Sequence, residues 1–571
     1  MAVVGDQPVP PRATATRRRT VAAAAAAALA VGALSSACTI PGQEPPKAAA
    51  VRADVRRGGV LTVATTAPNG LDPAAASDTA GKSISSLLCD TLVTVDPISG
   101  ELRPGLAESW VVSDGGKSIQ IKLGRKHVFS DGSRVESRVV VRSLARLANP
   151  ATASHSASLM APVLGYEAYR TAAENGDDRR SLFVGARVIE PYSLEIRLDH
   201  AQPEFVRTLA DPATAPVQTA AADRDPRAFA RAPVCSGPYA LATPYEPGAH
   251  ELRLRRSPRY AGGAQAVTDG GRGWADEVVF RVMPDAPAAY AAWQRDEVDI
   301  AAVPDEHVAE VRQNEAASLV SGANGQVEYI GLPAGEESPL RDTDLRQVLS
   351  AALDRKRIAH EVYGDSRLPA TGFVPPAAGR AYRDSACSFA APPNASGVKL
   401  PTTPIKLYFN DEFHHRALAE SVAAQWRDKL GLAVEPVALN WDQFLQKATT
   451  GTGFDGAFRL SLTPPQPDPV AYVRPVAHSS ATASTNLSRF TNLEVDAMLD
   501  EDVAKATDEG DRIIHVRRVE DKLCKLLPLV PVAFGQNHVL VRASRLGPAR
   551  ADGRLMSTDG RLLLRDMFIR P

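Results

Sequence analysis

Several stretches of the chain alternate apolar and polar residues with a period of two, the pattern of a strand with one buried face. The alternation holds over residues 119–123 and 194–198. Residues 60–64 and 278–282 are instead almost continuously apolar, which is typical of strands that are buried on both faces. The first half of the chain is therefore predicted to be rich in β-structure.

Beyond Met283 helical and strand patterns take turns. Apolar residues recur at positions i, i+3, i+4, i+7 and i+8 between Asp344 and about Tyr363, which predicts one amphipathic helix. Residues 405–409 and 432–437 read as strands, with a helical pattern between them. This alternation predicts an α/β fold with largely parallel sheets.

One stretch, residues 101–133, combines several local signals. Leu106, Ala107 and Trp110 give a short apolar face with helical spacing. Asp114-Gly115-Gly116 reads as a tight turn, because glycine accepts positive φ angles, and it leads into the alternating run from residue 119. The stretch is predicted to form a hairpin beside a short helix.

Length and charge narrow the class of protein. A chain of 571 residues is too long for one ordinary core, so we expect at least two domains. The 65 basic residues balance the 66 acidic ones, which gives no sign of a nucleic-acid surface. A hydrophobic content of 44% fits a globular protein with real cores.

The N-terminus has the layout of an export signal. Arg17, Arg18 and Arg19 precede an uncharged, alanine-rich run from Val21 to Ala37, and Cys38 follows. The run is shorter than the roughly 20 apolar residues of a membrane span. A cysteine at this point resembles a bacterial lipobox, so we expect residues 1–38 to be a signal peptide and Cys38 to be diacylated. Plain secretion is the alternative, and the export route, Sec or twin-arginine, stays open.

Residues 39–57 are rich in proline, alanine and charge, and are predicted to be a flexible tether. The expected location is the outer face of the cytoplasmic membrane. The remaining cysteines are Cys89, Cys235, Cys387 and Cys524. Their spacing does not fit a metal site, and disulfides and buried free thiols are equally compatible with it.

Two further motifs have residue types that occur in catalytic or metal sites. Residues 76–83 fit the loose pattern of a phosphate loop, but they are poor in glycine and Asp78 would place negative charge in a phosphate cradle. His414 and His415 are adjacent, so on a helix they point about 100° apart, a poor arrangement for one metal ion. We therefore expect no metal, no cofactor and no enzymatic activity.

The chain as a whole resembles the family 5 extracellular solute-binding proteins of ABC importers, the group that takes up oligopeptides, dipeptides and nickel. Many short segments carry the resemblance, in the family's order: Gly58 to Thr65 with Leu71-Asp72-Pro73, Asp96-Pro97, Gly100-Glu101, Pro104 to Trp110, Phe129 to Ser133, Ser236 to Tyr239, Ser257 to Tyr260, Glu297 to Ile300, Leu345 to Arg355, Pro467-Asp468-Pro469 and Pro531-Val532. They cover nearly everything after the tether.

The resemblance implies an α/β fold of the periplasmic-binding-protein type II, a two-lobed flytrap with a subdomain inserted in lobe I. Ligand would be trapped between the lobes, and two strands would cross the hinge, near Met283 and near Val530. The implied boundaries are lobe I at 58–95, the inserted subdomain at 96–199, lobe I again at 200–282, lobe II at 283–529 and a return to lobe I at 530–571.

The same resemblance implies ligand-binding residues. Trp441 is similar to the aromatic residue that lines the pocket in lobe II, and Arg459 to a basic residue that meets a ligand carboxylate. Phe534 lies where the second hinge strand passes the ligand, Leu71 lies in a loop on the ligand side, and Asp468 lies in the proline-rich turn. Each of them also has an ordinary reading as a core or surface residue.

One departure concerns the ligand. Peptide-binding members carry an acidic residue shortly before this turn, and Pro465 stands there instead. This departure argues against a classical site for a free peptide N-terminus, and it leaves an N-blocked or modified peptide, or a ligand that is not a peptide.

The expected function is a monomeric, membrane-tethered receptor that delivers a peptide or peptide-like solute to an ABC permease. The alternatives are a receptor for a nickel-chelate, an oligosaccharide or another organic solute, and a signalling lipoprotein that does not transport.

Overall fold

The structure is a computed structural model that describes residues 55–570, except 177–181, 203, 261–272, 413, 450–452, 465–466, 482–484, 507 and 551. Its main feature is an eleven-stranded sheet formed by these described residues. Ten strands follow the order β15-β14-β16-β12-β17-β11-β1-β10-β9-β8, and β13 pairs with β17 off this path. The strands are β1 (Val60–Thr65), β8 (Tyr239–Leu241), β9 (Glu251–Arg256), β10 (Glu277–Val282), β11 (Ile300–Ala302), β12 (Leu319–Gly331), β13 (Leu368–Pro369), β14 (Ile405–Asn410), β15 (Val434–Leu439), β16 (Ala457–Leu462) and β17 (Leu529–Val541).

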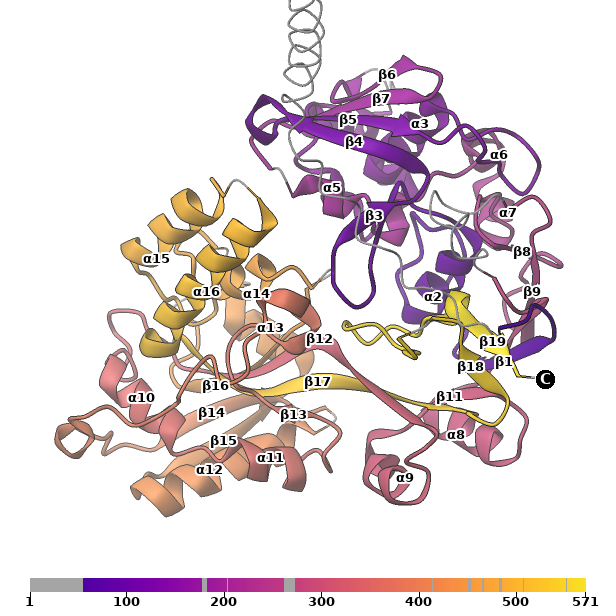
Figure 1. The fold of residues 1–571 in the computed structure, drawn as a ribbon. Helices are drawn as coiled ribbons and strands as arrows, with labels where there is room; N and C mark the ends of the chain where they lie inside the picture. The colour runs from indigo at the N-terminus through magenta and orange to yellow at the C-terminus, as the bar shows by residue number, and fades with distance from the viewer. Residues whose placement is uncertain are drawn as a thin grey trace, which may run out of the picture. The chain divides into compact units, whose positions relative to one another are not determined.

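Two long strands of this sheet, β12 and β17, carry the chain between two lobes. They pair antiparallel from Leu319↔Leu540 to Gly331↔Leu529, and the register shifts between Ala323 and Val327. We call this shifted stretch, residues 323–327 with the facing 534–536, the hinge. Figure 1 shows the two strands side by side, with β1 and β11 at one end and β14 to β16 at the other. This is the mixed α/β, two-lobed binding-protein fold that the sequence predicts.

Lobe I contains β1 and β8 to β11, together with the C-terminal residues after β17. Its core joins Leu61 and Val63 of β1 to Val278 and Phe280 of β10, and the C-terminal Met567 packs with them. Both strands were predicted from near-continuous apolar runs, and they pair in parallel from Val60↔Glu277 to Thr65↔Val282. Its other elements are α2 (Thr79–Leu88), α6 (Thr219–Arg224), α7 (Pro226–Arg231), α8 (Ala286–Gln294), α9 (Val308–Asn314), β18 (Leu546–Pro548) and β19 (Met567–Ile569).

Residues 96–199, predicted to be an inserted subdomain, hold a separate antiparallel sheet of order β4-β5-β7-β6. Its strands are β4 (Ala107–Ser113), β5 (Ser118–Leu123), β6 (Ala186–Glu190) and β7 (Ser193–Arg197), and its helices are α3 (Ser137–Ala148) and α4 (Tyr166–Glu174). Ile119 and Ile121 face Ile196 and Leu194 in the ladder and share a core with Leu144 of α3. The short pair β2 (Val93–Val95) and β3 (Leu102–Pro104) lies at its base.

The prediction of a short helix around Leu106 to Trp110 is wrong. Residues 107–113 form β4, in which Trp110 pairs with Ile121 and Val112 pairs with Ile119. Strand partners at most 16 positions away satisfy the backbone of these residues, and this pairing overrides the local helical spacing.

Lobe II contains β13 to β16 with helices on both faces of the sheet: α10 (Thr343–Ala351), α11 (Arg355–Glu361), α12 (His415–Leu430), α13 (Trp441–Thr449), α14 (Val470–Ala477), α15 (Leu493–Ala497) and α16 (Glu509–Leu526). The one helix predicted from Asp344 to Tyr363 is two. α10 ends at Ala351, and Asp354, which leaves the helical conformation, caps α11 by accepting the N–H of Arg357. The parallel pairing of β14 with β15 and β16 agrees with the α/β prediction.

The structure puts the first crossing later than the sequence pattern did. β11 pairs with β1 and with the Val541 end of β17, so residues 283–318 join lobe I and the chain crosses in β12. β17 begins at Leu529, but Val530 and Val532 still pack in a lobe II core, so the chain reaches lobe I only near Val539, later than the predicted return at Val530. The alternation of helix and strand patterns that starts beyond Met283 marks α8, the first helix after β10, and not the crossing itself.

Two disulfides resolve the cysteine alternatives. Cys89 bonds to Cys235 and Cys387 bonds to Cys524. The first joins the end of α2 to the segment before β8, and the second joins a loop to α16. Cys38 and the whole predicted signal and tether up to residue 54 lie outside the described residues. Among the residues that are described, no helix combines the length and apolarity of a membrane span.

Candidate functional site

An exposed tryptophan opens helix α13 in lobe II. The Trp441 side chain is 52% exposed, an unusual state for the largest apolar residue. Its ring stacks on Phe444, with centroids 6.2 Å apart and an angle of 11° between the planes. Phe444 contacts Phe454 at 5.0 Å, and Phe454 stacks on Phe458 of β16 at 4.6 Å. The aromatic series therefore fixes an accessible indole to the core of lobe II.

Arg459 follows Phe458 on β16, so its side chain points to the opposite face of the sheet from this aromatic series, and the residue is only 8% exposed. Its guanidinium forms a two-point ion pair with Glu328 of β12, through Nε to Oε1 and through Nη2 to Oε2 at 3.0 Å. Arg367 donates to the same carboxylate at 3.1 Å. The charge of Arg459 is thus matched inside the protein, and in this structure the group is not free to meet a ligand carboxylate.

Glu328 is the residue that sequence reasoning missed here. It is fully buried on the hinge strand and is separated from Arg459 by 131 positions. A signal was present, because residues 327–331 read Val-Glu-Tyr-Ile-Gly and a carboxylate inside an apolar strand needs a buried partner. Nothing local indicated which arginine would supply it.

His415 borders this buried ion pair. Burial, followed by the nearby charge of Arg459, lowers the pKa of its imidazole. Its Nδ1 lies 3.0 Å from the carbonyl oxygen of Asn410, whose side-chain oxygen accepts from Arg459 at 3.3 Å. The neutral ring therefore helps to hold the end of β14 against the arginine.

Asp468 lies in the turn before α14 and has two tasks there. It accepts the N–H of Val470 at 2.9 Å, and it pairs with both Nη atoms of Arg512, at 3.1 and 2.7 Å. Burial by itself would raise the pKa of Asp468, but the charge and hydrogen bonds of Arg512 outweigh it and keep the pKa below its usual range. The carboxylate is a capping and ion-paired group, as one of its two sequence readings allowed.

Phe534 and Leu71 are both core residues in the structure. Phe534 lies in the hinge at 1% exposure, and its ring meets Tyr382 edge-on at 6.2 Å. Leu71 is fully buried in the core of lobe I. The two side chains belong to different hydrophobic cores, so the structure does not bring Leu71 together with the lobe II residues.

The proline-rich turn that carries the departure from the family pattern is described only in part. Pro465 lies outside the described residues. Before it, Leu462 ends β16 in a half-buried position, and Gln326 of the hinge donates to Ser461 at 2.9 Å. The end of β16 is thus tied to the hinge next to the turn.

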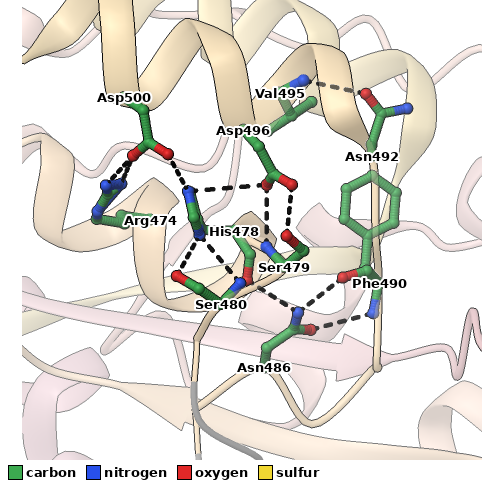
Figure 2. A network of polar contacts seen from close by, with 10 residues as sticks. All are labelled: Arg474, His478, Ser479, Ser480, Asn486, Phe490, Asn492, Val495, Asp496 and Asp500. Atoms are coloured by element: carbon green, nitrogen blue, oxygen red, sulfur yellow. Dashed lines mark hydrogen bonds and ion pairs between the residues drawn. The ribbon is translucent and has the colours of Figure 1, made fainter.

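A polar network follows α14 (Figure 2). His478 lies between Ser480, whose Oγ is 2.7 Å from Nδ1, and Asp500, whose Oδ2 is 3.0 Å from Nε2. A serine, a histidine and an aspartate in line suggest nucleophilic chemistry. However, Nδ1 also accepts the backbone N–H of Ser480 at 3.1 Å, and Asp500 is paired with Arg474 at 2.9 Å. These contacts fix a tight turn at the end of the helix.

The neighbouring residues of this network serve the same purpose. Asp496 accepts the N–H of Ser479 at 2.9 Å, and Asn486 donates to the carbonyls of His478 and Phe490. Asn492 caps α15 through the N–H of Val495 at 3.0 Å. Within the described residues no group of three or more histidine, cysteine, aspartate or glutamate side chains has the arrangement of a metal site.

Comparison with known proteins gives the family. Residues 101–484, more than half of the chain, match the bacterial extracellular solute-binding proteins, family 5 (middle region). The periplasmic oligopeptide-binding protein OppA of Escherichia coli is 26% identical over 497 residues, which span 83% of this chain and 86% of OppA. Heme-binding protein A of Haemophilus influenzae is 24% identical over 492 residues, 82% of this chain and 85% of the relative.

Solved structures show the same fold. The unliganded open form of the murein tripeptide binding protein MppA superposes with a TM-score of 0.77 at 20% identity, over 92% of this chain and 99% of MppA. Haemophilus influenzae OppA in complex with RPPGFSPFR gives a TM-score of 0.62 at 19% identity, over 91% of this chain and 100% of that chain. Both likenesses extend over the two lobes.

Proposed function

This chain belongs to the bacterial extracellular solute-binding proteins of family 5, and we propose that it is the substrate-binding receptor of an ABC import system. It captures a peptide or peptide-like solute between its two lobes and delivers it to a membrane permease, without covalent chemistry. Relatives named for oligopeptides and for murein tripeptide support a peptide-like ligand. Binding between two hinged lobes is a general way to sequester a solute.

The observation that carries the site is the exposed Trp441 on α13. A rigid aromatic face, anchored through Phe444 and half open to solvent, offers apolar contact area at a low cost in side-chain entropy. We place the ligand against this face. Phe534 belongs to the same lobe II core as Phe444, whereas Arg459 and Asp468 are held by ion pairs with Glu328 and Arg512, and Leu71 lies in the core of lobe I.

Native mass spectrometry of the purified protein, followed by calorimetry with peptides of two to nine residues, tests this proposal. Trp441→Ala is expected to weaken binding by about tenfold or more, in line with the loss of a buried aromatic contact. Leu493→Ala is the matched control, because Leu493 is 87% exposed on α15 and should not change affinity. Equal affinity of the Trp441 variant and the wild type would remove Trp441 from the site.

Other solutes remain open within the same fold. Relatives are named for heme and, with a probable assignment, for deoxycholate, so a non-peptide organic solute, an oligosaccharide or a nickel-chelate is the alternative ligand class. Failure of every peptide, together with a co-purified non-peptide mass, would select this alternative. A signalling lipoprotein that does not transport is the alternative from another class. Cells that lack the gene and still take up the bound solute would select it.

We also propose export and anchoring through Cys38 to the outer face of the cytoplasmic membrane, as a monomer. The lipobox-like end of the signal and the proline-rich tether support this location. Cys38→Ala is expected to move the protein from the membrane fraction to the soluble exported fraction. A variant that stays with the membrane would contradict the anchor.

A further inference from the structure

A hairpin near the C-terminus lies against the middle of the two long strands. Its two arms meet at the bridge between Met556 and Leu562, and inside it the N–H of Gly560 donates to the carbonyl of Ser557 at 3.0 Å. We call residues 556–562 the C-terminal hairpin. Met556 packs into the core of lobe I, so the base of the hairpin belongs to that lobe. Figure 1 shows this yellow segment reaching from β18 and β19 toward β12.

Glycines let the C-terminal hairpin touch the backbone of β12 directly. Gly560 has a φ of +74°, and a Cβ there would lie 2.6 Å from the carbonyl oxygen of Ala323, where the hinge begins. On the facing side, a Cβ on Gly322 would lie 2.6 Å from Sδ of Met556 and 3.1 Å from Cα of Gly560. A side chain at position 560 therefore requires the hairpin to move away from β12.

Side-chain amides continue this contact into the hinge. Asn537 of β17 donates its Nδ2 to the carbonyl of Gly560 at 3.1 Å, and its Oδ1 accepts from Nδ2 of Asn324 at 3.2 Å. Oδ1 of Asn324 accepts the backbone N–H of Gln326 at 3.1 Å. Both amides use their donor and their acceptor, so these hydrogen bonds fix the orientation of each one.

The same series of hydrogen bonds ends on lobe II. Nε2 of Gln326 donates to Oγ of Ser461, on β16, at 2.9 Å. We call the hydrogen bonds from Gly560 to Ser461 the amide series. At its tip the C-terminal hairpin also contacts the inserted subdomain, because the N–H of Thr558 donates to the carbonyl of Pro97 at 2.9 Å. The hairpin and the amide series thus connect the subdomain, the hinge and β16.

The stretch that the amide series crosses is interrupted as a ladder. Residues 324–326 of β12 face only Gly535 of β17, because the register shifts there. Gly325 has a φ of +79°, outside the range of a regular strand. A bulge leaves its extra residues without ladder partners, so side-chain contacts decide its conformation. The angle between the lobes depends on this conformation, because β12 and β17 carry the chain between them.

We propose that Asn324, Asn537 and the C-terminal hairpin position the hinge for ligand capture: they hold the bulge in one conformation and so limit the range of separations between the two lobes. The inference rests on the proposed function only in treating lobe movement as the capture step. A narrower range leaves less conformational freedom to be lost when a ligand is bound. The hairpin lies beyond residues 101–484, the part of the chain that matches the family, and this gives it a task.

Pulsed electron paramagnetic resonance on the full chain, with Cys38→Ser and without ligand, tests the proposal. Spin labels at Val111→Cys in the subdomain and Leu493→Cys on α15 report the separation of the lobes, because both positions are exposed, at 62% and 87%. In Gly560→Ala we expect the fraction of molecules outside the main distance peak to grow by about two- to tenfold, the change in population that the loss of one hydrogen bond produces.

Gly553→Ala is the matched control. Gly553 has nearly the same φ, +73°, but no atom of the described residues lies within 4 Å of the place where its Cβ would be. The variant therefore carries the same backbone strain without a contact to β12, and it should keep the wild-type distribution. An unchanged distribution in Gly560→Ala, or an equal broadening in Gly553→Ala, would overturn the proposal.

Alanine at the two asparagines tests the amide series without backbone strain. Asn324→Ala and Asn537→Ala should each broaden the distribution, and the double variant should broaden it no more than the larger single change, because both remove the same series. Urea midpoints should stay close to the wild type, since Asn537 is exposed and Asn324 is half-buried. Unchanged distances in both single variants, or effects that simply add in the double variant, would also overturn the proposal. These distances need no ligand, whereas the peptide calorimetry tests the proposed function, so the two can fail independently.

Discussion

At the scale of single residues, the charged groups around the candidate site are matched from inside the protein. Glu328 is fully buried and takes two arginines, Arg459 and Arg367. Asp468 is matched by Arg512. Removing one member of such a buried pair leaves the others without compensation, which costs far more than the pair itself contributes.

Glu328→Gln is expected to lower the free energy of unfolding by about 3–5 kcal/mol, because it leaves two buried guanidinium groups without a counter-charge. Urea denaturation measures the change. Glu361→Gln is the matched control, since Glu361 forms an exposed pair with Arg357 at 2.8 Å and its loss should cost under about 1 kcal/mol. Similar midpoints for the two variants would show that the ion pairs of Glu328 with its arginines do not stabilise the folded protein in solution.

Peptides with free and with blocked termini are expected to bind with affinities within about threefold of each other, a difference below 1 kcal/mol. A ligand carboxylate could reach Arg459 only by displacing Glu328 into an uncompensated buried state. Calorimetry with one tetrapeptide and its N-acetylated, C-amidated form measures the ratio. A preference for the free peptide of about a hundredfold or more would show that charged termini are read.

At the scale of elements, α16 holds the segment of residues 370–390 at two points. Glu520 of α16 is fully buried and accepts the N–H groups of Phe373 and Val374 at 3.0 and 2.9 Å. The disulfide Cys387–Cys524 ties the far end of the segment to the same helix. Through Tyr382, which meets Phe534 edge-on, the segment contacts the hinge.

Replacing Cys387 and Cys524 together by alanine is therefore expected to cost about 2–5 kcal/mol of stability, the usual range for a native disulfide. Because the segment touches Phe534, ligand affinity should fall as well. Denaturation midpoints and calorimetry measure the two effects. An unchanged denaturation midpoint in the double alanine variant would mean that Glu520 alone fixes the segment. Adding Glu520→Gln to that variant would then have to produce the loss of stability.

Elements whose periodicity matches their structure could be predicted from the sequence, and two whose local spacing indicated another structure could not. The alternation at residues 119–123 and 194–198 became β5 and β7, and the apolar runs became β1 and β10. β4 was missed because its strand partner, and not its own spacing, decides its structure. The break between α10 and α11 was missed because Asp354 gives its capping signal inside an unbroken apolar pattern.

The candidate site was less predictable than the fold. Trp441 could be picked out from its segment and is exposed, but the pairing of Arg459 with Glu328 joins positions 131 apart with no local sign. The disulfides join positions 146 and 137 apart, for the same reason beyond the reach of spacing rules. The sequence determines all these pairs, yet they are visible only once β12, β16 and α16 are placed.

At the scale of the whole molecule, three buried histidines in separate parts of the chain have pKa values below the ordinary histidine value. Burial is the largest cause that lowers the pKa of His127, of His415 and of His538. His538 lies on β17 beside the hinge, where its Nδ1 is 2.7 Å from the hydroxyl of Ser321 on β12 and its Nε2 is 2.8 Å from the carbonyl of Ser366. A neutral ring satisfies both contacts, accepting from the hydroxyl and donating to the carbonyl.

The free energy of unfolding is therefore expected to fall as the pH drops below about 6.5, the ordinary pKa of histidine. Below that pH the unfolded chain binds protons that the folded chain does not. The loss continues down to the lowered pKa values of the folded state. His538→Gln should make the decline shallower when urea midpoints are measured between pH 7.5 and 5. His360→Asn is a control of opposite sign: Asp365 raises the pKa of that exposed histidine, so its stabilisation is present in acid and is lost as the pH rises. If the decline is no shallower in His538→Gln, His538 takes up a proton in the folded state. The contacts that its neutral ring makes with Ser321 and Ser366 would then have to change.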